Sequence, residues 1–225
     1  MAKGKKRRVF KVKNILLLLF LFLGIVGLVY YGVTMPVKNV YIKGNYILSD
    51  GEIMKISALD KYPSFLLTSS KSIRDKIIKN SYVKDVKISK KFGNVIEVNI
   101  LEYSAVFSFE DKIILSNGEI IPNTYNLSDV PILLNMIDDS SLLKRTAIKF
   151  GGVDANVLRQ ISEVEYQPVE VDGDRFLLYM NDGNLIYITL TKINKINKYN
   201  QIRDKLDGHI GIIYLDAGDY VELKS

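Results

Sequence analysis

The chain has 225 residues, of which 48% are hydrophobic and 25% charged, so it can build one or two packed domains and is too apolar to be disordered throughout. It contains no cysteine and one histidine, His209, which excludes disulfide scaffolds, cysteine nucleophiles and metal sites built from thiolates or several histidines. The net charge of +6 comes from residues 1–13, which hold seven of the 31 Lys and Arg residues and no acid. A nucleic-acid partner needs cations spread across the contact surface, so this concentration of charge in one tail disfavours such a partner.

A long apolar segment follows this basic tail. Residues 14–37 contain no charged side chain, and fourteen of residues 15–33 are Leu, Ile, Phe or Val. Because a helix of about 20 apolar residues crosses the ~30 Å hydrocarbon core of a bilayer, we predict a transmembrane helix at residues 14–36. The excess of bases before it places the tail in the cytoplasm and the rest of the chain outside. A cleaved signal peptide has the same order of segments, but its apolar region is usually ~7–15 residues and ends in small residues, which favours the membrane anchor here.

Residues 37–103 alternate between strand and helix patterns. Val40 and Ile42 share one side of an expected strand, and Ser49 with Glu52 forms the sequence of a capping box that opens a helix. In order, we expect a strand at 37–43, a helix opened by Ser49, a helix opened by Ser70 or Ser72, and two strands at 86–88 and 96–100 on either side of a turn at 92–94. This β-α-α-β-β order predicts a small sheet with two helices on one face.

Residues 104–225 are mostly β in pattern, with short apolar segments between turns rich in Gly, Asn and Asp. One helix is predicted from near Asp154, and another is predicted to be capped by Thr191 and to end at Gly208. The apolar face of the first would be Val157, Leu158, Ile161 and Val164. The expected strands are at 106–109, 113–115, 119–121, 169–171, 176–180, 185–190, 211–215 and 220–223. The predicted fold class is α+β, with a single N-terminal transmembrane helix, the small sheet, and a second, mostly β domain with helices packed on one sheet.

Three segments carry a family resemblance. Val40–Asn45 reads V-Y-I-K-G-N, Val83–Ile88 reads V-K-D-V-K-I, and Ile96–Val106 reads I-E-V-N-I-L-E-Y-S-A-V. In this order, behind a basic tail and one span, they resemble the FtsQ/DivIB family of bacterial cell-division proteins. Gly93 and Ser104 depart from the family pattern, which often has proline at these turn and strand-end positions.

The resemblance implies a POTRA domain at residues 37–103 and a β domain at residues 104–225 that ends in an edge strand. It also implies a single-pass protein of the cell membrane at the division septum, with its C-terminal domains outside. The implied partners are division proteins of the DivIC/FtsB and FtsL types. Some family members carry a disordered C-terminal tail, and because the sequence ends at Ser225 we do not expect one here.

The sequence offers few candidates for catalysis or metal binding. Asp172-Gly173-Asp174 has the spacing of two calcium-binding carboxylates, but the third acid and the bidentate glutamate of an EF-hand are missing, so we predict a hairpin turn. Asp138-Asp139 is expected in a loop or as a helix cap, and His209 is expected at a helix end. No motif selects a Ser-Lys pair of the kind that membrane-anchored peptidases use. We expect no catalytic, cofactor or metal site and no small-molecule substrate.

The last predicted strand is the candidate interaction site. Tyr220, Val221, Glu222 and Leu223 alternate and lack proline, and a strand at the end of the chain has no following element to cover its edge. An open edge can receive a strand from another protein, and the family resemblance implies that a DivIC/FtsB-type partner docks here. The alternative is a plain structural strand whose edge is blunted by charge, such as that of Glu222 and Lys224.

These observations together predict a non-catalytic scaffold of the divisome. One alternative is a membrane-anchored exported enzyme of the Ser/Lys type, which a Ser-Lys pair or an acid beside His209 at hydrogen-bonding distance would favour. The other is a wall- or signal-binding ectodomain, which a concave pocket lined by aromatic side chains would favour. A second interaction surface is expected on the POTRA domain, on a face that the sequence does not reveal.

Overall fold

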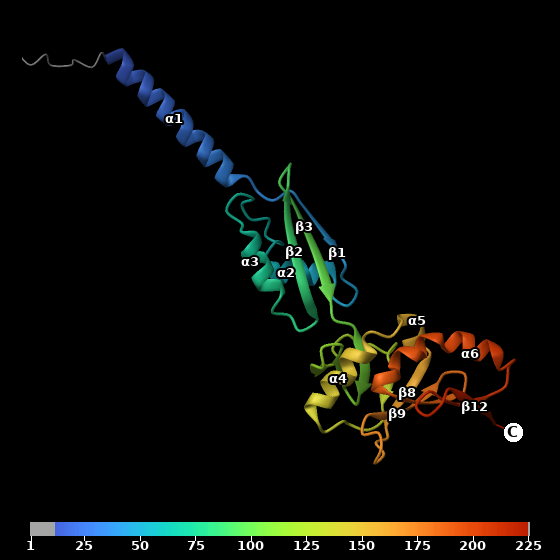
Figure 1. Ribbon diagram of the computed structural model, residues 1–225. Coiled ribbons are helices and arrows are strands. Elements are labelled where there is room, and N and C mark those ends of the chain that lie inside the picture. The colour runs from blue at the N-terminus through green and yellow to red at the C-terminus, as the bar shows by residue number, and fades with distance from the viewer. Residues whose placement is uncertain (1–11, 225) are drawn as a thin grey trace, which may run out of the picture. The chain divides into compact units, whose positions relative to one another are not determined.

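An apolar helix, α1 (Val12–Thr34), opens the part of the chain that the computed structural model describes, residues 12–224 (Figure 1). None of its residues is buried, and it is long and apolar enough to cross a membrane. It ends at Thr34, before the predicted limit of residue 36, because Pro36 disfavours the helical conformation at the residue before it. The predicted basic tail, residues 1–13, lies outside the described residues except for Val12 and Lys13, which begin α1.

The chain divides into two compact units. The first contains α1 and the residues up to Asn80, together with Asp85–Leu101. The second contains Ser81–Lys84 and the chain from Glu102 onward. In the first unit, β1 pairs in parallel with β3 within a sheet of order β1-β3-β2. Its elements confirm the predicted β-α-α-β-β order: β1 (Asn39–Lys43), α2 (Asp50–Ser57), α3 (Ser70–Ile77), β2 (Val83–Lys91) and β3 (Val95–Glu102).

Local sequence signals explain why the elements of the first unit form. The predicted capping box opens α2, since the Glu52 N–H donates to Ser49 Oγ at 3.3 Å and the Ser49 N–H donates to Glu52 Oε2 at 2.9 Å. α3 begins at Ser70, one of the two predicted starts. The β2–β3 turn places Gly93 and Asn94 at φ of 84° and 62°, the conformation that tight hairpins require. The core between helices and sheet is aliphatic and includes Ile53, Ile73, Ile77, Ile96 and Val98.

The second unit contains a nine-stranded sheet of order β12-β11-β10-β9-β8-β7-β4-β5-β6. Its strands are β4 (Ala105–Phe109), β5 (Lys112–Leu115), β6 (Ile120–Pro122), β7 (Ile132–Leu133), β8 (Ile161–Tyr166), β9 (Arg175–Met180), β10 (Leu185–Thr189), β11 (Gly211–Tyr214) and β12 (Tyr220–Leu223). Its helices are α4 (Ser140–Phe150), α5 (Ala155–Leu158), the 3-10 helix η1 (Leu190–Lys198) and α6 (Tyr199–Lys205). These helices and the sheet share one apolar core, which confirms the predicted α+β class.

The helix predicted from near Asp154 is wrong beyond its first turn. Asp154 caps α5 as expected, but α5 has four residues, and Ile161 and Val164 lie in β8. Both side chains are buried, and the β8–β9 register shifts between Ile161 and Glu163. Because this bulge inserts an extra residue, two side chains three positions apart reach the same face of the sheet. The bulge therefore gives a strand the apolar spacing of a helix.

Three further details differ from the sequence predictions. The sequence pattern predicts no helix at residues 140–150, but the expectation of a helix cap at Asp138-Asp139 is confirmed. Asp139 caps α4 by accepting hydrogen bonds from the N–H groups of Ser141 and Leu142 at 2.8 and 3.2 Å. The strand predicted at 169–171 is a loop between β8 and β9, which follows from Pro168, since proline has no N–H to donate to a ladder. The helix predicted from Thr191 instead begins with η1, whose N-cap is Thr189.

Candidate functional site

The four predicted partner-binding residues form β12, which lies at one end of the nine-stranded sheet. β12 pairs with β11 in antiparallel orientation, from Tyr220 opposite Tyr214 to Leu223 opposite Gly211. All four of its side chains are exposed. Within the described residues no strand pairs with the outer side of β12, so this side is an open sheet edge.

The backbone of β12 presents specific groups at this edge. The Lys224 N–H donates to the Ile210 carbonyl at 2.8 Å. Because bonded and non-bonded positions alternate along an antiparallel strand, Tyr220 and Glu222 direct their backbone groups toward β11. The N–H and C=O groups of Val221 and Leu223 therefore point away from β11, toward the open edge. A strand added from another molecule would bond to these two residues.

One face of the sheet carries a row of stacked side chains that ends at the open edge. The Arg175 guanidinium lies 4.0 Å from the centre of the Tyr187 ring. Tyr187 stacks on Tyr214 with centroids 5.3 Å apart, and Tyr214 stacks on Tyr220 at 4.6 Å. Glu222 accepts a hydrogen bond from the Tyr214 hydroxyl at 3.2 Å, and desolvation together with this carboxylate raises the pKa of Tyr214. The last ring, Tyr220, can extend the row onto a side chain of an added strand.

A groove of about 470 Å³ separates the helices from the end of the sheet. Its apolar lining comes from both sides and consists of Ile202, Leu206, Ile213, Leu215 and Val221. Lys195, at one end, forms an ion pair with Asp219, with Nζ–Oδ distances of 2.5 and 2.8 Å. Lys198 and Lys205 also line the groove and form no ion pair with any residue in the range 12–224. The groove therefore combines an apolar floor with two uncompensated cations beside β12.

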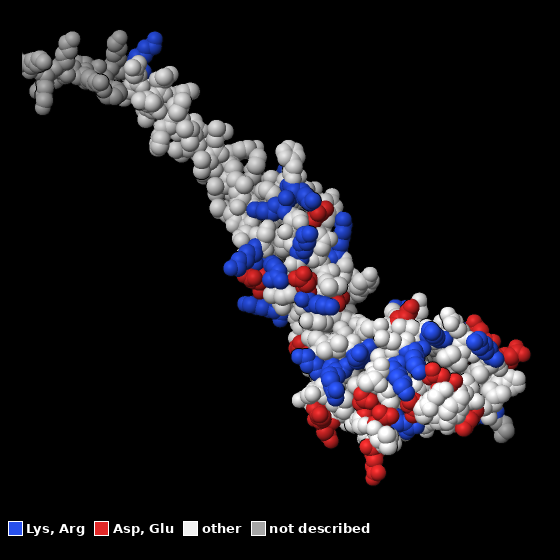
Figure 2. Space-filling model, in the orientation of Figure 1, with Lys and Arg blue, Asp and Glu red and all other residues white. Residues whose placement is uncertain are grey.

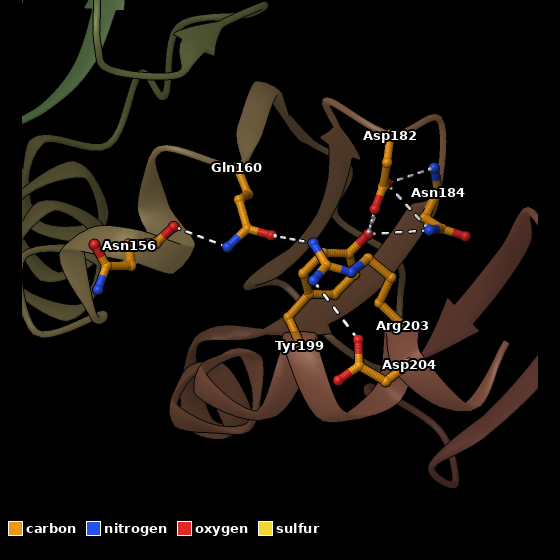
Figure 3. A network of polar contacts seen from close by, with 7 residues as sticks. All are labelled: Asn156, Gln160, Asp182, Asn184, Tyr199, Arg203 and Asp204. Atoms are coloured by element: carbon orange, nitrogen blue, oxygen red, sulfur yellow. Dashed lines mark hydrogen bonds and ion pairs between the residues drawn. The ribbon is translucent and has the colours of Figure 1, made fainter. Parts of the chain in front are cut away.

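A polar network joins Tyr199, Asp182 and Asn184 (Figure 3), and it also reaches the start of β11. The Tyr199 hydroxyl donates to Asp182 Oδ2 at 2.6 Å, and Asn184 Nδ2 donates to that hydroxyl at 3.0 Å. Asn184 Oδ1 in turn accepts from the Gly211 N–H, the first residue of β11, at 2.8 Å. Burial and the hydrogen bond to Asp182 raise the pKa of Tyr199, so this phenol stays protonated and acts as a structural donor.

A second polar contact fixes the turn that leads from β11 to β12. Arg175 Nε lies 2.7 Å from Asp216 Oδ2, and both side chains are largely buried. Lys192 Nζ also donates to the backbone carbonyl of Asp216. With Lys195 bound to Asp219, these contacts connect both ends of the β11–β12 turn to neighbouring elements. The edge strand is thus held in a fixed place before any partner binds.

The other residues considered from sequence are not gathered into one site. Asp172 and Asp174 lie in the β8–β9 connection, where the Tyr166 hydroxyl donates to the Gly173 carbonyl at 2.8 Å. His209 Nδ1 lies 2.9 Å from the Leu206 carbonyl oxygen, close to the end of α6. No group of three or more His, Asp or Glu side chains in residues 12–224 is placed to hold a metal ion. In the same range, the hydrogen bonds of the serine hydroxyls lead to carboxylates and backbone groups, and none joins a lysine amine.

Sequence reasoning identified the edge strand but not the surfaces on either side of it. The tyrosine row joins Tyr187, Tyr214 and Tyr220 through strand pairing, which the sequence alone does not reveal. Two of the groove lysines, Lys198 and Lys205, are seven positions apart, and this spacing places them on one side of a helix. From the sequence, this spacing could have predicted a basic helix surface beside the groove.

A family model and the named relatives of this chain point to one family. Residues 35–103 match the family model of the POTRA domain, FtsQ-type, which includes all five elements from β1 to β3. The cell division protein DivIB of Bacillus subtilis is 30% identical over 194 residues, which cover 83% of this chain and 73% of that protein. DivIB of Geobacillus kaustophilus is 26% identical over 228 residues, which cover 97% of this chain and 87% of that protein.

The solved structures that match include the major extracytoplasmic domain of the trans isomer of DivIB from Geobacillus stearothermophilus. It is 24% identical, covers 47% of this chain and 95% of its own, and superposes with a TM-score of 0.40. The apolar helix α1 and the relatives together fit a single-pass membrane protein with a role in cell division. The identity and coverage of the Bacillus subtilis relative show that the chain belongs to the FtsQ/DivIB family of cell division proteins.

Proposed function

We propose that the protein is a non-catalytic scaffold of the bacterial divisome, which α1 anchors in the membrane and which holds partner ectodomains outside the cell. The seven bases of the N-terminal tail support a cytoplasmic N-terminus, because positively charged flanks stay inside. We assign the POTRA domain to residues 37–103 and the β domain to residues 104–225. The site of action is the division septum, in keeping with the relatives named as cell division proteins.

The open edge of β12 is the observation that carries this proposal. A partner segment that adds to this edge would bond to the outward N–H and C=O groups of Val221 and Leu223. Each such bond contributes a net ~1 kcal/mol, so the backbone gives moderate affinity. On one face of the added strand a side chain would stack on Tyr220, and on the other a side chain would reach the groove beside Val221. The partner class is the membrane-proximal ectodomain of a DivIC/FtsB-type protein, with an FtsL-type protein in the same assembly.

Anchoring lets such moderate contacts suffice. Two proteins confined to the same membrane surface meet at an effective concentration far above their bulk concentration. A site that is weak in solution is therefore occupied at the septum, and partners can still exchange as division proceeds. The fixed position of β12, set by Asn184, Arg175 and Lys195, supports this role because a preformed edge loses little entropy on binding.

The test removes an outward backbone donor without breaking the β11–β12 ladder. Val221→Pro deletes an N–H that points away from β11, and proline is tolerated on edge strands with this geometry. Full-length protein in lipid nanodiscs is titrated with a full-length DivIC/FtsB-type protein. We expect affinity to fall about fivefold or more, corresponding to a loss of ~1–3 kcal/mol.

Val171→Pro is the matched control, because Val171 is an exposed valine in the loop between β8 and β9. We expect this variant to bind as the parent chain does. Hydrogen exchange at Ile212 and Glu222, which face each other as a hydrogen-bonded pair, reports whether the β11–β12 ladder stays intact in each variant. Full affinity in a Val221→Pro chain with intact pairing would reject β12 as the docking site.

A further inference from the structure

Large apolar side chains are exposed at one end of the first unit. Phe92 lies at the tip of the β2–β3 hairpin and is fully exposed, at 105% of its reference area. Leu66 and Leu67, in the loop between α2 and α3, are 59% and 69% exposed. Exposed apolar side chains gather on a protein surface where another protein or a membrane covers them.

This end of the unit is hydrogen-bonded to the segment that directly follows α1. The Phe65 N–H donates to the Met35 carbonyl at 2.8 Å, and the Val37 N–H donates to the Pro63 carbonyl at 2.9 Å. At the hairpin, Asn94 Nδ2 donates to the Pro36 carbonyl at 3.0 Å. Both the α2–α3 loop and the hairpin turn are therefore held beside residues 35–38, whatever direction α1 takes.

Membrane dimensions place residues 35–38 in the headgroup layer. The uncharged part of α1, Asn14–Thr34, spans ~31 Å at 1.5 Å per residue, against a hydrocarbon core of ~30 Å. The headgroup layer on each side adds ~5–7 Å. Leu67 is two residues from Phe65, and Phe92 is two residues from Asn94, and two residues of chain reach at most ~7 Å. The exposed side chains are thus within reach of the boundary between headgroups and hydrocarbon.

Charges at this end also suit a lipid surface. Lys90 and Lys91 immediately precede Phe92, and Lys90 Nζ lies 4.6 Å from the centre of the Phe65 ring. Lys38 is exposed in the segment that follows α1. Lys91 is paired with Glu97 at 3.5 Å, which leaves Lys38 and Lys90 without an acid partner among residues 12–224. Figure 2 shows an uncharged hairpin tip with Lys and Arg side chains gathered below it in that view. Apolar tips with flanking lysines bind the interface of membranes that contain anionic lipid.

We propose that Phe92, Leu66 and Leu67 insert into the headgroup boundary of the same bilayer that α1 spans. The POTRA unit then rests on the lipid surface, held by α1 and by this tip, and does not rotate freely about the end of α1. The occupant is lipid because the surface is continuous with the membrane segment through Met35–Lys38. This contact goes beyond the docking function proposed for β12 and uses none of its residues.

The chain contains no tryptophan, which permits a direct test in the full-length protein. Phe92→Trp places one fluorescent reporter at the tip, where its larger ring meets no packing restriction because the site is fully exposed. Tyr46→Trp is the matched control, since Tyr46 is 93% exposed and follows β1 at the end of the sheet remote from the hairpin. Each variant is reconstituted in vesicles of phosphatidylcholine and phosphatidylglycerol, with or without brominated acyl chains.

We expect Phe92→Trp emission at shorter wavelength than that of Tyr46→Trp, strong quenching by brominated lipid and weak quenching by aqueous acrylamide. The Tyr46→Trp variant should give the opposite quenching pattern. Equal acrylamide quenching of both variants in lipid vesicles would overturn the proposal. The proposal would also be overturned if the tryptophan of Phe92→Trp became protected from acrylamide only after other division proteins were added. A protein, and not lipid, would then cover the tip. Neither outcome depends on whether β12 binds its partner.

Discussion

The first unit exposes apolar side chains at its hairpin tip and in its α2–α3 loop, whereas the second unit exposes the backbone of an edge strand. Leu66, Leu67 and Phe92 can meet an apolar phase in many orientations, because apolar burial has no direction. The outward groups of Val221 and Leu223 would accept an added strand only in a set register, because hydrogen bonds are directional. If both proposals hold, one protein combines a tolerant contact with lipid and a selective contact with a partner.

The interiors of the two units differ in a related way. The first unit has an aliphatic core between two short helices and a three-stranded sheet. The second unit adds buried polar contacts, those of Tyr199 with Asp182 and Asn184 and the Arg175–Asp216 pair, and both lie at the β11–β12 end. Hydrogen bonds inside the second unit therefore fix the position of β12, whose backbone groups form the open edge.

The largest effect on this comparison is expected from removing Asn184. Asn184→Ala leaves the Gly211 N–H without its acceptor and deprives Tyr199 of one donor, and each buried group left unsatisfied costs ~1–3 kcal/mol. We expect the second unit to lose ~2–4 kcal/mol of unfolding free energy and the Gly211 amide to exchange faster. Urea unfolding and hydrogen exchange of the full chain measure both.

Asn99→Ala in β3 provides the control for this change. The Asn99 side chain is half-buried and makes no side-chain hydrogen bond with residues 12–224. The same substitution there should alter stability by no more than ~0.5 kcal/mol and leave β12 unchanged. Equal effects of the two substitutions would mean that the network around Tyr199 does not position the edge.

Local patterns made the first unit predictable, while pairing between distant segments limited prediction of the second. The Ser49–Glu52 capping box and the turn at Gly93 and Asn94 act within a few residues, so the sequence displays them directly. The bulge at Ile161 has no such local signature and imitates a helix. The alternation of residues 220–223 predicted the strand β12 directly. The groove and the tyrosine row, in contrast, depend on β10 pairing in parallel with β11 across η1 and α6.

High pH should lower the stability of the second unit by a smaller amount, through Tyr179. The Tyr179 hydroxyl donates to Glu165 at 2.9 Å, and this bond and burial raise the pKa of Tyr179 to about 12 from an ordinary value of 10.0. A raised folded-state pKa means that the stabilising contribution is complete below pH 10 and is lost as the pH rises toward 12. We expect the second unit to lose ~1 kcal/mol through this group across that interval. Thermal melts of the full chain at successive pH values measure the loss.

Tyr179→Phe tests the assignment, because phenylalanine keeps the ring and removes the titrating hydroxyl. The variant should be less stable than the parent at neutral pH and should show a flatter stability profile above pH 10, the ordinary pKa of the phenol. An unchanged alkaline slope would show that Tyr179 does not contribute to the pH dependence of the second unit.

The smallest effect is expected from the groove lysines, whose charges lie beside the edge strand and would act on the affinity of a partner. Lys198→Glu with Lys205→Glu reverses the two uncompensated cations beside β12, so a partner segment with acidic side chains loses two favourable contacts. Each exposed pair contributes ~0.2–1 kcal/mol, so affinity should fall severalfold at low salt and approach that of the parent chain at high salt. The control, Lys144→Glu with Lys149→Glu on α4, changes net charge equally and lies outside the groove. If both pairs of substitutions weaken binding alike, only the overall charge of the second unit matters, and the partner reads β12 through its backbone and Tyr220 alone.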